Sequence, residues 1–455
     1  MQPLRAPSTL VRRRRADRRC LPWLLVLFGI GSASAGNTRV SVASDGSEGN
    51  NHAGQALISA NGRFVAFDSS ASNLVGSDTN NAWDVFVHDR QTHQTKRVSV
   101  ASDGREANAD ARNQSERAPA ISADGRFVAF RSAADNLVSG DTNQSFDVFV
   151  HDRQSAQTTR VSVGSGGIEG DDHSSFFSDI AISADGRYVV FESGATNWIA
   201  PDTNGNDIYR HDRQSGQTIR VSQSSAGVQA NQGCLGPAMS ADGRYIAFRS
   251  YADNLVSGDV GGLQDVFVHD VQTGTTIRAS VGVGGVEGND DSSDDVALSG
   301  SGRVLAWVSS ANNLVANDNN NRADVFVRDL DAGTTTRVSV DSSGVEANDF
   351  SSQPALSFDG RYVAFWSQAS NLVAGDGNDW DVFVHDRSTG VTRLMSVGVG
   401  GAAAGGLVPT LSGDGFWIAF SSDSTNLVAS DGNLATDIFV TPGVPQLFGD
   451  GFEGP

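Results

Sequence analysis

A stretch of nine residues, 122–130, recurs seven times along the chain and constrains the fold more than any other feature. Each copy contains a turn glycine followed by a short apolar run. The seven glycines are Gly62, Gly125, Gly186, Gly243, Gly302, Gly360 and Gly415, and successive ones lie 55 to 63 residues apart. A period of this length is typical of propellers and other repeat arrays, in which each unit covers the apolar faces of its neighbours.

The repeat unit begins with a tight hairpin. In six of the seven copies the turn glycine follows Asp or Asn, and apolar runs flank the pair. These residues adopt the positive φ angles of a two-residue turn, so they predict two antiparallel strands, here called a and b. Strand b, for example residues 64–67, is apolar on both faces, so both faces must be covered. This pattern favours stacked propeller blades over a two-layer sandwich.

Two further strands complete the unit. A long b–c loop leads to strand c, which starts with Asp as in residues 147–153, and a polar turn leads to strand d, residues 159–163. The first d strand, 39–42, precedes every a–b–c unit, and the last c strand, 437–440, has no d strand after it. We therefore predict an all-β fold: a single seven-bladed β-propeller of four-stranded antiparallel blades over residues 36–441, closed by the N-terminal strand, which completes the last blade.

The repeats resemble the WD-like propeller repeats of the TolB type, which have a Ser-Pro/Ala-Asp-Gly turn, a short apolar strand and a later strand ending in Asp. The resemblance covers residues 37–441. It implies a propeller but little about activity, because such blades serve as adaptors, receptors and companions to peptidases. Seven units and long loops distinguish this chain from TolB itself, which argues against a role in the Tol envelope machinery.

The first 35 residues predict a signal peptide. Seven arginines precede an apolar run at 21–30, and an Ala-Ser-Ala cleavage site follows at 33–35. The apolar run is shorter than the roughly 20 residues needed to span a bilayer, so no membrane span is expected in the mature chain. We expect a protein of the periplasm or the extracellular medium. Residues 442–455 are expected to form a short C-terminal tail.

The charge of the chain restricts its partners. The formal charge is −20, and removal of residues 1–35, which hold seven Arg and one Asp, brings it to −26. Such a charge repels nucleic acid and anionic membranes and favours cations or basic partners. Cys234 is the single cysteine after residue 35, so no intramolecular disulfide is expected. We predict a monomer whose ligand is an unknown protein or glycan.

No residue is predicted to be catalytic. Five of the eight histidines occupy one position of strand c, each followed by Asp: His88, His151, His211, His269 and His385. A His-Asp pair that recurs identically in five blades indicates a structural pair within each blade rather than one active site. The sequence has neither a Gly-x-Ser-x-Gly nucleophile motif nor a His-Glu-x-x-His zinc motif.

The acidic loops are the candidate metal sites. The b–c loops carry Asp-x-Asn followed by a third carboxylate, and closely spaced oxygens of this kind suit calcium. The predicted ligands are Asp78, Asn80, Asp84, Asp141, Asn143, Asp147, Asp202, Asn204, Asp207, Asp318, Asn320, Asp324, Asp376, Asn378, Asp381, Asp431, Asn433 and Asp437. In blade four Gly261 replaces the Asn, so this blade is predicted not to bind calcium. The alternative is that these residues form hydrogen-bonded turns that need no ion.

Two functional hypotheses remain open. The first is an exported, non-enzymatic propeller that acts as a binding or scaffold module through the acidic face of its b–c and d–a loops, with calcium as a candidate ligand. The second is a secreted hydrolase or lyase with a site built from loops on the same face. Catalysis requires polar residues that one blade has and the others lack, so the regularity of the repeats favours binding. Glu106, Glu169 and Glu287 of the d–a loops are candidate binding residues.

Overall fold

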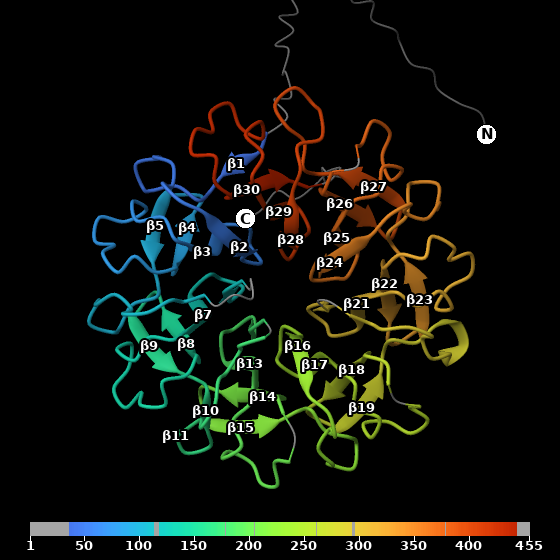
Figure 1. The fold of residues 1–455 in the computed structure, drawn as a ribbon, viewed down its shortest axis with the longest axis horizontal. Coiled ribbons are helices and arrows are strands. Elements are labelled where there is room, and N and C mark those ends of the chain that lie inside the picture. Colours follow the sequence, from blue (N-terminus) through green and yellow to red (C-terminus); the bar gives the residue numbers. More distant parts are fainter. Residues whose placement is uncertain are drawn as a thin grey trace, which may run out of the picture. The chain divides into compact units, whose positions relative to one another are not determined.

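The computed structural model describes residues 36–443, except 113–117, 178, 204, 261, 294–295 and 378. Over this range the chain forms seven four-stranded antiparallel sheets arranged as blades around a ring (Figure 1). The predicted seven-bladed propeller is confirmed. The predicted signal peptide and residues 444–455 of the predicted tail lie outside the described residues. Among the described residues, no helix is long and apolar enough to cross a membrane.

The strands of each blade follow one another from the centre of the ring to its rim (Figure 1). Blades one to three are β2 (Ala53–Ile58), β3 (Phe64–Ser69), β4 (Asp84–Asp89) and β5 (Gln94–Arg97); β6 (Ala120–Ile121), β7 (Phe127–Ser132), β8 (Asp147–Asp152) and β9 (Gln157–Arg160); β12 (Ala181–Ile182), β13 (Tyr188–Ser193), β14 (Asp207–Asp212) and β15 (Gln217–Arg220). Blades four to six are β16 (Cys234–Met239), β17 (Tyr245–Ser250), β18 (Asp265–Asp270) and β19 (Thr275–Arg278); β20 (Ala297–Leu298), β21 (Val304–Ser309), β22 (Asp324–Asp329) and β23 (Thr334–Arg337); β24 (Ser351–Leu356), β25 (Tyr362–Ser367), β26 (Asp381–Asp386) and β27 (Val391–Leu394). A short hairpin, β10 (Val163–Gly164) with β11 (Ile168–Glu169), and a 3₁₀ turn, η1 (Val283–Gly285), lie in d–a loops.

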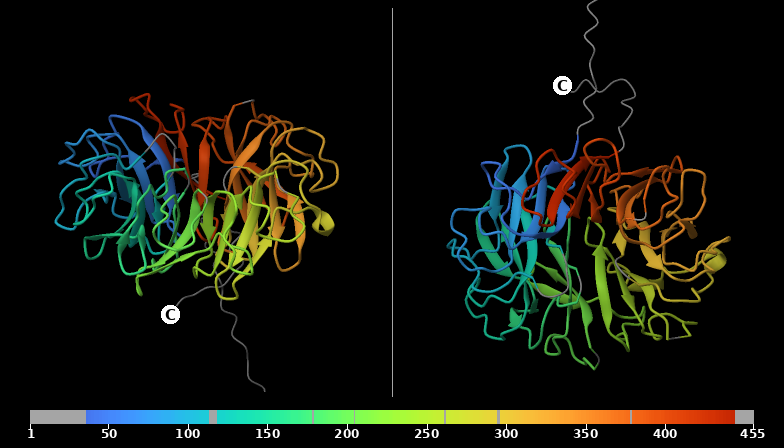
Figure 2. Two further views of the ribbon diagram at one scale, coloured as in Figure 1. Left: turned by 60° about the horizontal axis from the view of Figure 1, so that its bottom comes forward. Right: turned by 45° about the horizontal axis from the view of Figure 1, so that its top comes forward.

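The N-terminal strand completes blade seven. This blade consists of β28 (Leu407–Leu411), β29 (Trp417–Ser422), β30 (Asp437–Pro442) and β1 (Thr38–Arg39). Thr38 pairs with Val440 and Arg39 with Phe439, and the Val40 amide donates to the Ile438 carbonyl at 2.8 Å. Figures 1 and 2 show the blue N-terminal segment beside the red strands of this blade. The predicted closure of the ring is therefore confirmed.

Strand b is apolar on both faces because each blade packs against two neighbours. Successive side chains of a strand point to opposite faces of the sheet. In blade one, Val65 and Phe67 pack in a buried cluster with Ala419 and Val440 of blade seven. Ala66, between them in sequence, belongs to the cluster shared with blade two. The core is thus a series of interfaces between blades rather than one central cluster.

The turn glycines also connect the blades. Gly125 has a φ of +75°, and a Cβ atom at this position would lie 2.1 Å from the ring of Phe64 in the preceding blade. Gly62 is covered in the same way by Trp417 of blade seven. Glycine is therefore required for both the turn conformation and the close approach of the neighbouring ring. The contact of Gly62 with Trp417 is a second link across the point of closure.

Deletion of residues 36–45 should lower the melting temperature sharply. The deletion removes β1, exposes the edge of β30 and takes the buried Val40 out of the interface between blades seven and one. Thermal unfolding followed by circular dichroism measures the effect. Asp45→Ala, in an exposed part of the same segment, is the control and should leave the melting temperature nearly unchanged. An equally small effect of the deletion would contradict the closure of the ring by β1.

Candidate functional site

The predicted metal-binding residues lie on one face of the ring. Antiparallel strands alternate in direction, so the b–c and d–a loops leave each blade at the same end. We call this side the loop face and the opposite side, with the a–b and c–d turns, the turn face. Among the described residues, four groups of three carboxylates have ligand atoms within 4.8 Å of one another, close enough to bind one metal ion. They are Glu48/Asp431/Asp437, Asp141/Asp147/Glu169, Asp259/Asp265/Glu287 and Asp318/Asp324/Glu346.

An arginine from strand d already lies within each of these groups. In blade two, Nη1 of Arg160 is 3.2 Å from Asp141, 3.2 Å from Asp147 and 2.6 Å from Glu169. Six blades have an arginine in this position: Arg39, Arg97, Arg160, Arg220, Arg278 and Arg337. The guanidinium therefore occupies the place that the sequence analysis gave to calcium. Glu106, Glu169 and Glu287, predicted as binding residues, are partners of these arginines.

The Asn of the Asp-x-Asn motif forms a turn. Nδ2 of Asn143 donates to the Gly170 carbonyl at 3.0 Å and to Asp147 at 3.3 Å. Its Oδ1 accepts the backbone N–H of Ser145 at 3.0 Å. Three others make equivalent contacts, namely Asn80, Asn320 and Asn433. These amide oxygens are engaged in the turn, as the alternative interpretation expects. Asn204 and Asn378 lie outside the described residues.

The first Asp of strand c connects several elements of its blade. Asp265 is almost fully buried, and its Oδ1 accepts a hydrogen bond of 2.5 Å from Ser280 of the next strand segment. Burial raises the pKa of Asp207, Asp265 and Asp324 to about 6, although arginine and serine partners act in the opposite direction. The arginine and the serine lie two residues apart, as in Arg278 and Ser280, so both face this carboxylate. The Arg-x-Ser pattern of strand d, which recurs in six blades, is the sequence signal for this arrangement, although it was not among the predicted site residues.

Blade six departs from this pattern. Leu394 takes the position of the arginine, and Ala403 takes that of the glutamate. Oδ1 of Asp381 still accepts hydrogen bonds from Ser396 at 2.5 Å and from the Gly405 amide at 3.2 Å. Its Oδ2 and both carboxylate oxygens of Asp376 have no arginine or lysine partner among the described residues. Burial, together with the adjacent Asp381, raises the pKa of Asp376.

Blade four keeps its carboxylates despite the loss of the Asn. Arg278 lies 3.2 Å from Asp265 and 2.8 Å from Glu287, as in its sister blades. Gly261, which led to the prediction that this blade does not bind calcium, lies outside the described residues. The carboxylates are thus regular in blade four, and blade six is the one that leaves them without an arginine.

A cavity of about 580 Å³ adjoins blade six on the loop face. Trp380, Ala403 and Gly405 line one side, and residues 421–424 of blade seven line the other. Trp380 is 44% exposed, and its ring lies 4.4 Å from that of Trp366. The cavity therefore combines an accessible aromatic wall with the Gly405 backbone that contacts Asp381.

The strand c histidines do not pair with the Asp that follows them. His151 Nδ1 lies 2.8 Å from Thr158 Oγ1, whereas Asp152 receives two hydrogen bonds from Arg126, at 2.8 and 2.7 Å. Adjacent residues of a strand point to opposite faces, so a His-Asp pair cannot form within strand c. The structural role predicted for these histidines holds, but the partner is a threonine of strand d.

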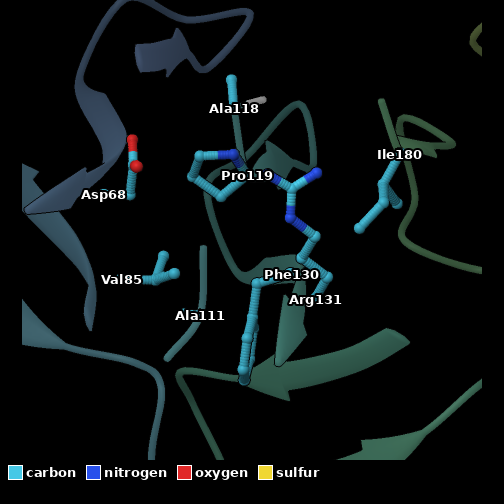
Figure 3. Close-up of a pocket in the computed structure, with 8 residues that line it drawn as sticks. All are labelled: Asp68, Val85, Ala111, Ala118, Pro119, Phe130, Arg131 and Ile180. Atoms are coloured by element: carbon cyan, nitrogen blue, oxygen red, sulfur yellow. The ribbon is translucent and has the colours of Figure 1, made fainter. Parts of the chain in front are cut away.

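Strand b carries a second departure from symmetry. Its fifth position is charged and buried in blades one to four, with Asp68, Arg131, Glu192 and Arg249, and uncharged in blades five to seven, with Val308, Trp366 and Ser421. Figure 3 shows Asp68 and Arg131 at a cavity of about 10 Å³, room for about one water molecule. Asp68 also lies 3.5 Å from Arg112. The sequence analysis missed these charges because they follow apolar runs.

A channel lies at the centre of the ring, where the a strands converge. Its cavity of about 290 Å³ is lined mainly by apolar side chains, including Leu57, Ile182, Met239 and Leu411. Ala118 and Ile180 line both this channel and the small cavity at Asp68. Asp68 and Arg131 are thus connected to the apolar channel through the residues that line both cavities.

No family model matches this chain, and neither does any curated protein sequence. Solved structures do match it. An oligogalacturonate lyase in complex with manganese has 11% sequence identity and a TM-score of 0.51, over 91% of this chain and 95% of that chain. The oligogalacturonate lyase of Vibrio parahaemolyticus has 12% identity and a TM-score of 0.50, with the same coverage. The β-propeller domain of the Trilobed protease from Pyrococcus furiosus has 9% identity and a TM-score of 0.51, over 86% of this chain and 95% of that domain.

A TolB structure from Acinetobacter baumannii also matches, at 16% identity and a TM-score of 0.37, over 75% of this chain and 62% of that chain. At such identities the matches show the propeller fold alone, because one fold supports many functions. The TolB-type resemblance stays a prediction at the level of the family.

The strand c histidines should make the fold acid-sensitive. Burial lowers the pKa of His151 from 6.5 to about 4, so the unfolded chain binds a proton more readily than the folded one, and the folded state loses stability as the pH falls from 6.5 toward 4. We expect His151→Asn to cost about 2–3 kcal/mol of unfolding free energy at pH 7 and clearly less near pH 4. Denaturant unfolding at several pH values measures this difference. His93→Asn, at an exposed turn residue, is the control. A cost independent of pH would contradict a buried neutral His151.

Proposed function

We propose that the chain is an exported, non-enzymatic binding propeller that captures a basic ligand through its loop face. The observation that carries the proposal is the unequal distribution of charge between the two faces. Exposed carboxylates without an arginine or lysine partner among the described residues gather in the b–c and d–a loops: Asp135, Asp171, Asp253, Asp290, Asp379 and Asp423. Such a surface attracts cationic partners and repels anionic ones.

The turn face differs because many of its carboxylates are paired with arginines. Arg126, at the a–b turn of blade two, lies 2.7 Å from Asp152 of strand c. The same pair recurs in four other blades, as Arg63–Asp89, Arg187–Asp212, Arg244–Asp270 and Arg361–Asp386. Turn-face carboxylates outside these pairs, such as Asp124, are offset by arginines on the same face that form no salt bridge among the described residues, such as Arg90 and Arg153, so the excess negative charge lies on the loop face. The cavity beside Trp380 opens on that same face and gives a ligand a place to enter.

Charge variants of the two faces test this proposal. Joint replacement of Asp253, Asp379 and Asp423 by Asn should weaken binding of a short peptide of alternating Arg and Gly about tenfold, because rim charges contribute modestly and together. The matched control replaces Asp124, Asp242 and Asp359 of the turn face by Asn, which blade one already has at this position as Asn61. Fluorescence anisotropy at low and high salt measures binding, with a Glu-Gly peptide for comparison. Equal losses in both variants, or no preference for the basic peptide, would overturn the proposal.

A secreted hydrolase or lyase is the second candidate, and the buried charges of blades one to four favour it. Asp68 and Arg131 line a small cavity that shares Ala118 and Ile180 with the channel, and blades five to seven have no charged counterpart. Polar groups confined to part of a symmetric ring are what catalysis requires. The names of the oligogalacturonate lyases that share the fold supply the first substrate to try. Formation of unsaturated products from oligogalacturonate, lost in Arg131→Gln, would favour the enzyme over the binding module.

Calcium in the loops stays a prediction, and the arginines define how to test it. We expect millimolar calcium to leave the wild-type melting temperature almost unchanged, because Arg160 lies among Asp141, Asp147 and Glu169. Arg160→Met should cost about 3–5 kcal/mol, since it leaves buried carboxylates unpaired, and calcium should restore part of the loss. Thermal melts with calcium, magnesium or chelator decide this. A calcium-specific rise in the wild type as large as in the variant would show that the ion binds beside the arginine.

A further inference from the structure

Blade six has Leu394 where six blades have the strand d arginine, so its aspartates lack an internal cation and could bind a positively charged group of a ligand. Strand pairing places Leu394 opposite Phe383, as Arg160 lies opposite Phe149 and Arg337 opposite Phe326. The Val397–Ala403 bridge likewise corresponds to Val340–Glu346 of blade five. The backbone of blade six therefore pairs as in the other blades. Leu394 in place of the arginine removes the internal cation, and Ala403 in place of the glutamate removes the third carboxylate.

The carboxylates that remain are buried and incompletely satisfied. Asp381 is fully buried, and its Oδ2 has no hydrogen-bond donor among the described residues. This is the oxygen that binds the arginine elsewhere; in blade two, Oδ2 of Asp147 lies 3.2 Å from Arg160. Asp376 lies against Asp381 and hydrogen-bonds to it, and no arginine or lysine pairs with either carboxyl among the described residues. Two carboxyl groups in contact and shielded from water cannot both be ionised unless a cation lies between them; without one, the pair keeps a proton.

The other blades show which cation fits this geometry. Nη1 lies between the two aspartates, and Nη2 donates to the backbone carbonyl that precedes the first of them, for example Gly140 at 3.0 Å. Ser77, Pro201, Asn317 and Ser430 accept the same bond in four other blades. Gly375 is the corresponding residue of blade six. The other blades thus show how a guanidinium would be bound in blade six, because blade six has the two aspartates and the backbone carbonyl at the same positions.

A cavity lies close to Asp376 and Asp381, from which a ligand could approach them. Ala403 and Gly405 line the 580 Å³ cavity, and the Gly405 amide contacts Asp381. Ala403 lines this cavity at the position where blade five has Glu346. Trp380 provides an exposed aromatic ring at the same cavity, and guanidinium groups stack favourably on tryptophan. Asp379 and Asp423, both exposed, add negative charge at its edge.

We propose that blade six is a guanidinium-binding site, in which an arginine side chain of a partner enters the cavity beside Trp380 and pairs with Asp376 and Asp381. The partner's arginine takes the place that Arg39, Arg97, Arg160, Arg220, Arg278 and Arg337 fill within their own blades. This inference rests on the proposed function and names the group that the loop face recognises.

Titration calorimetry with L-arginine tests the site. We expect saturable binding of L-arginine and at least tenfold weaker binding of L-citrulline, which has nearly the same shape but no charge. Leu394→Arg should abolish L-arginine binding and maintain or raise the melting temperature, because it restores the pattern of six blades. Asp376→Asn should also weaken binding at least tenfold, and Leu394→Met, the matched control, should preserve it. Asp376→Asn keeps the test decisive if Leu394→Arg fails to fold.

Three results would overturn the inference. They are equal binding of citrulline and arginine, undiminished arginine binding by folded Leu394→Arg protein, and binding of calcium but not arginine at this position. If the Arg-Gly peptide binds the loop face but free arginine neither binds nor competes, this inference fails and the proposed function stands. If arginine binds at blade six but the loop-face Asp variants bind the peptide normally, the broader proposal fails and the site stands.

Discussion

The buried pairing of one arginine with two or three carboxylates is the interaction on which six of the seven blades depend. In blade two, Arg160 of strand d holds Asp141 of the b–c loop, Asp147 of strand c and Glu169 of the d–a loop. A charge removed from water is tolerated only when paired, so these four elements must come together for any of them to be stable. The long loops are thereby fixed to the sheet although they contain little regular structure. The same interaction closes the ring, because Arg39 binds Asp437 at 3.0 Å from the other end of the chain.

Repetition of this group makes its absence informative. A side chain that serves the fold recurs in every blade, as the turn glycines and the threonine-bound histidines nearly do. In blade six the arginine and the glutamate are missing, and the aspartates remain buried beside a cavity with an exposed tryptophan. The buried charges of blades one to four are the other departure from symmetry. Function in a symmetric ring is best sought at such positions. The binding proposal points to blade six, and the enzyme alternative points to the buried charges of blades one to four.

The sequence predicted most of the architecture because its signals are local and periodic. Gly125 marks a turn through its φ angle, and the Phe127 to Phe130 run marks a strand buried on both faces. The unpaired first d strand predicted the closure, since Arg39 and the segment after Asp437 each needed a partner. The candidate site was harder to predict. Asp78 and Asn80 have the composition of a calcium loop, and nothing within that loop shows that Arg97, from a later strand, supplies the cation.

By itself, then, the sequence determined the number of blades, the order of their strands and the closure by the N-terminal segment. The number and order follow from spacing and turn chemistry within about sixty residues, and the closure follows from the count of strands, which leaves a d strand at the start and a c strand at the end without partners. Only the tertiary structure decided what the acidic residues do, because that depends on contacts between distant segments, such as Arg39 with Asp437. It also decided that blade six, and not blade four, lacks its internal cation. The reason is that a missing Asn alters one turn, whereas a missing arginine leaves two buried carboxylates without their charge partner.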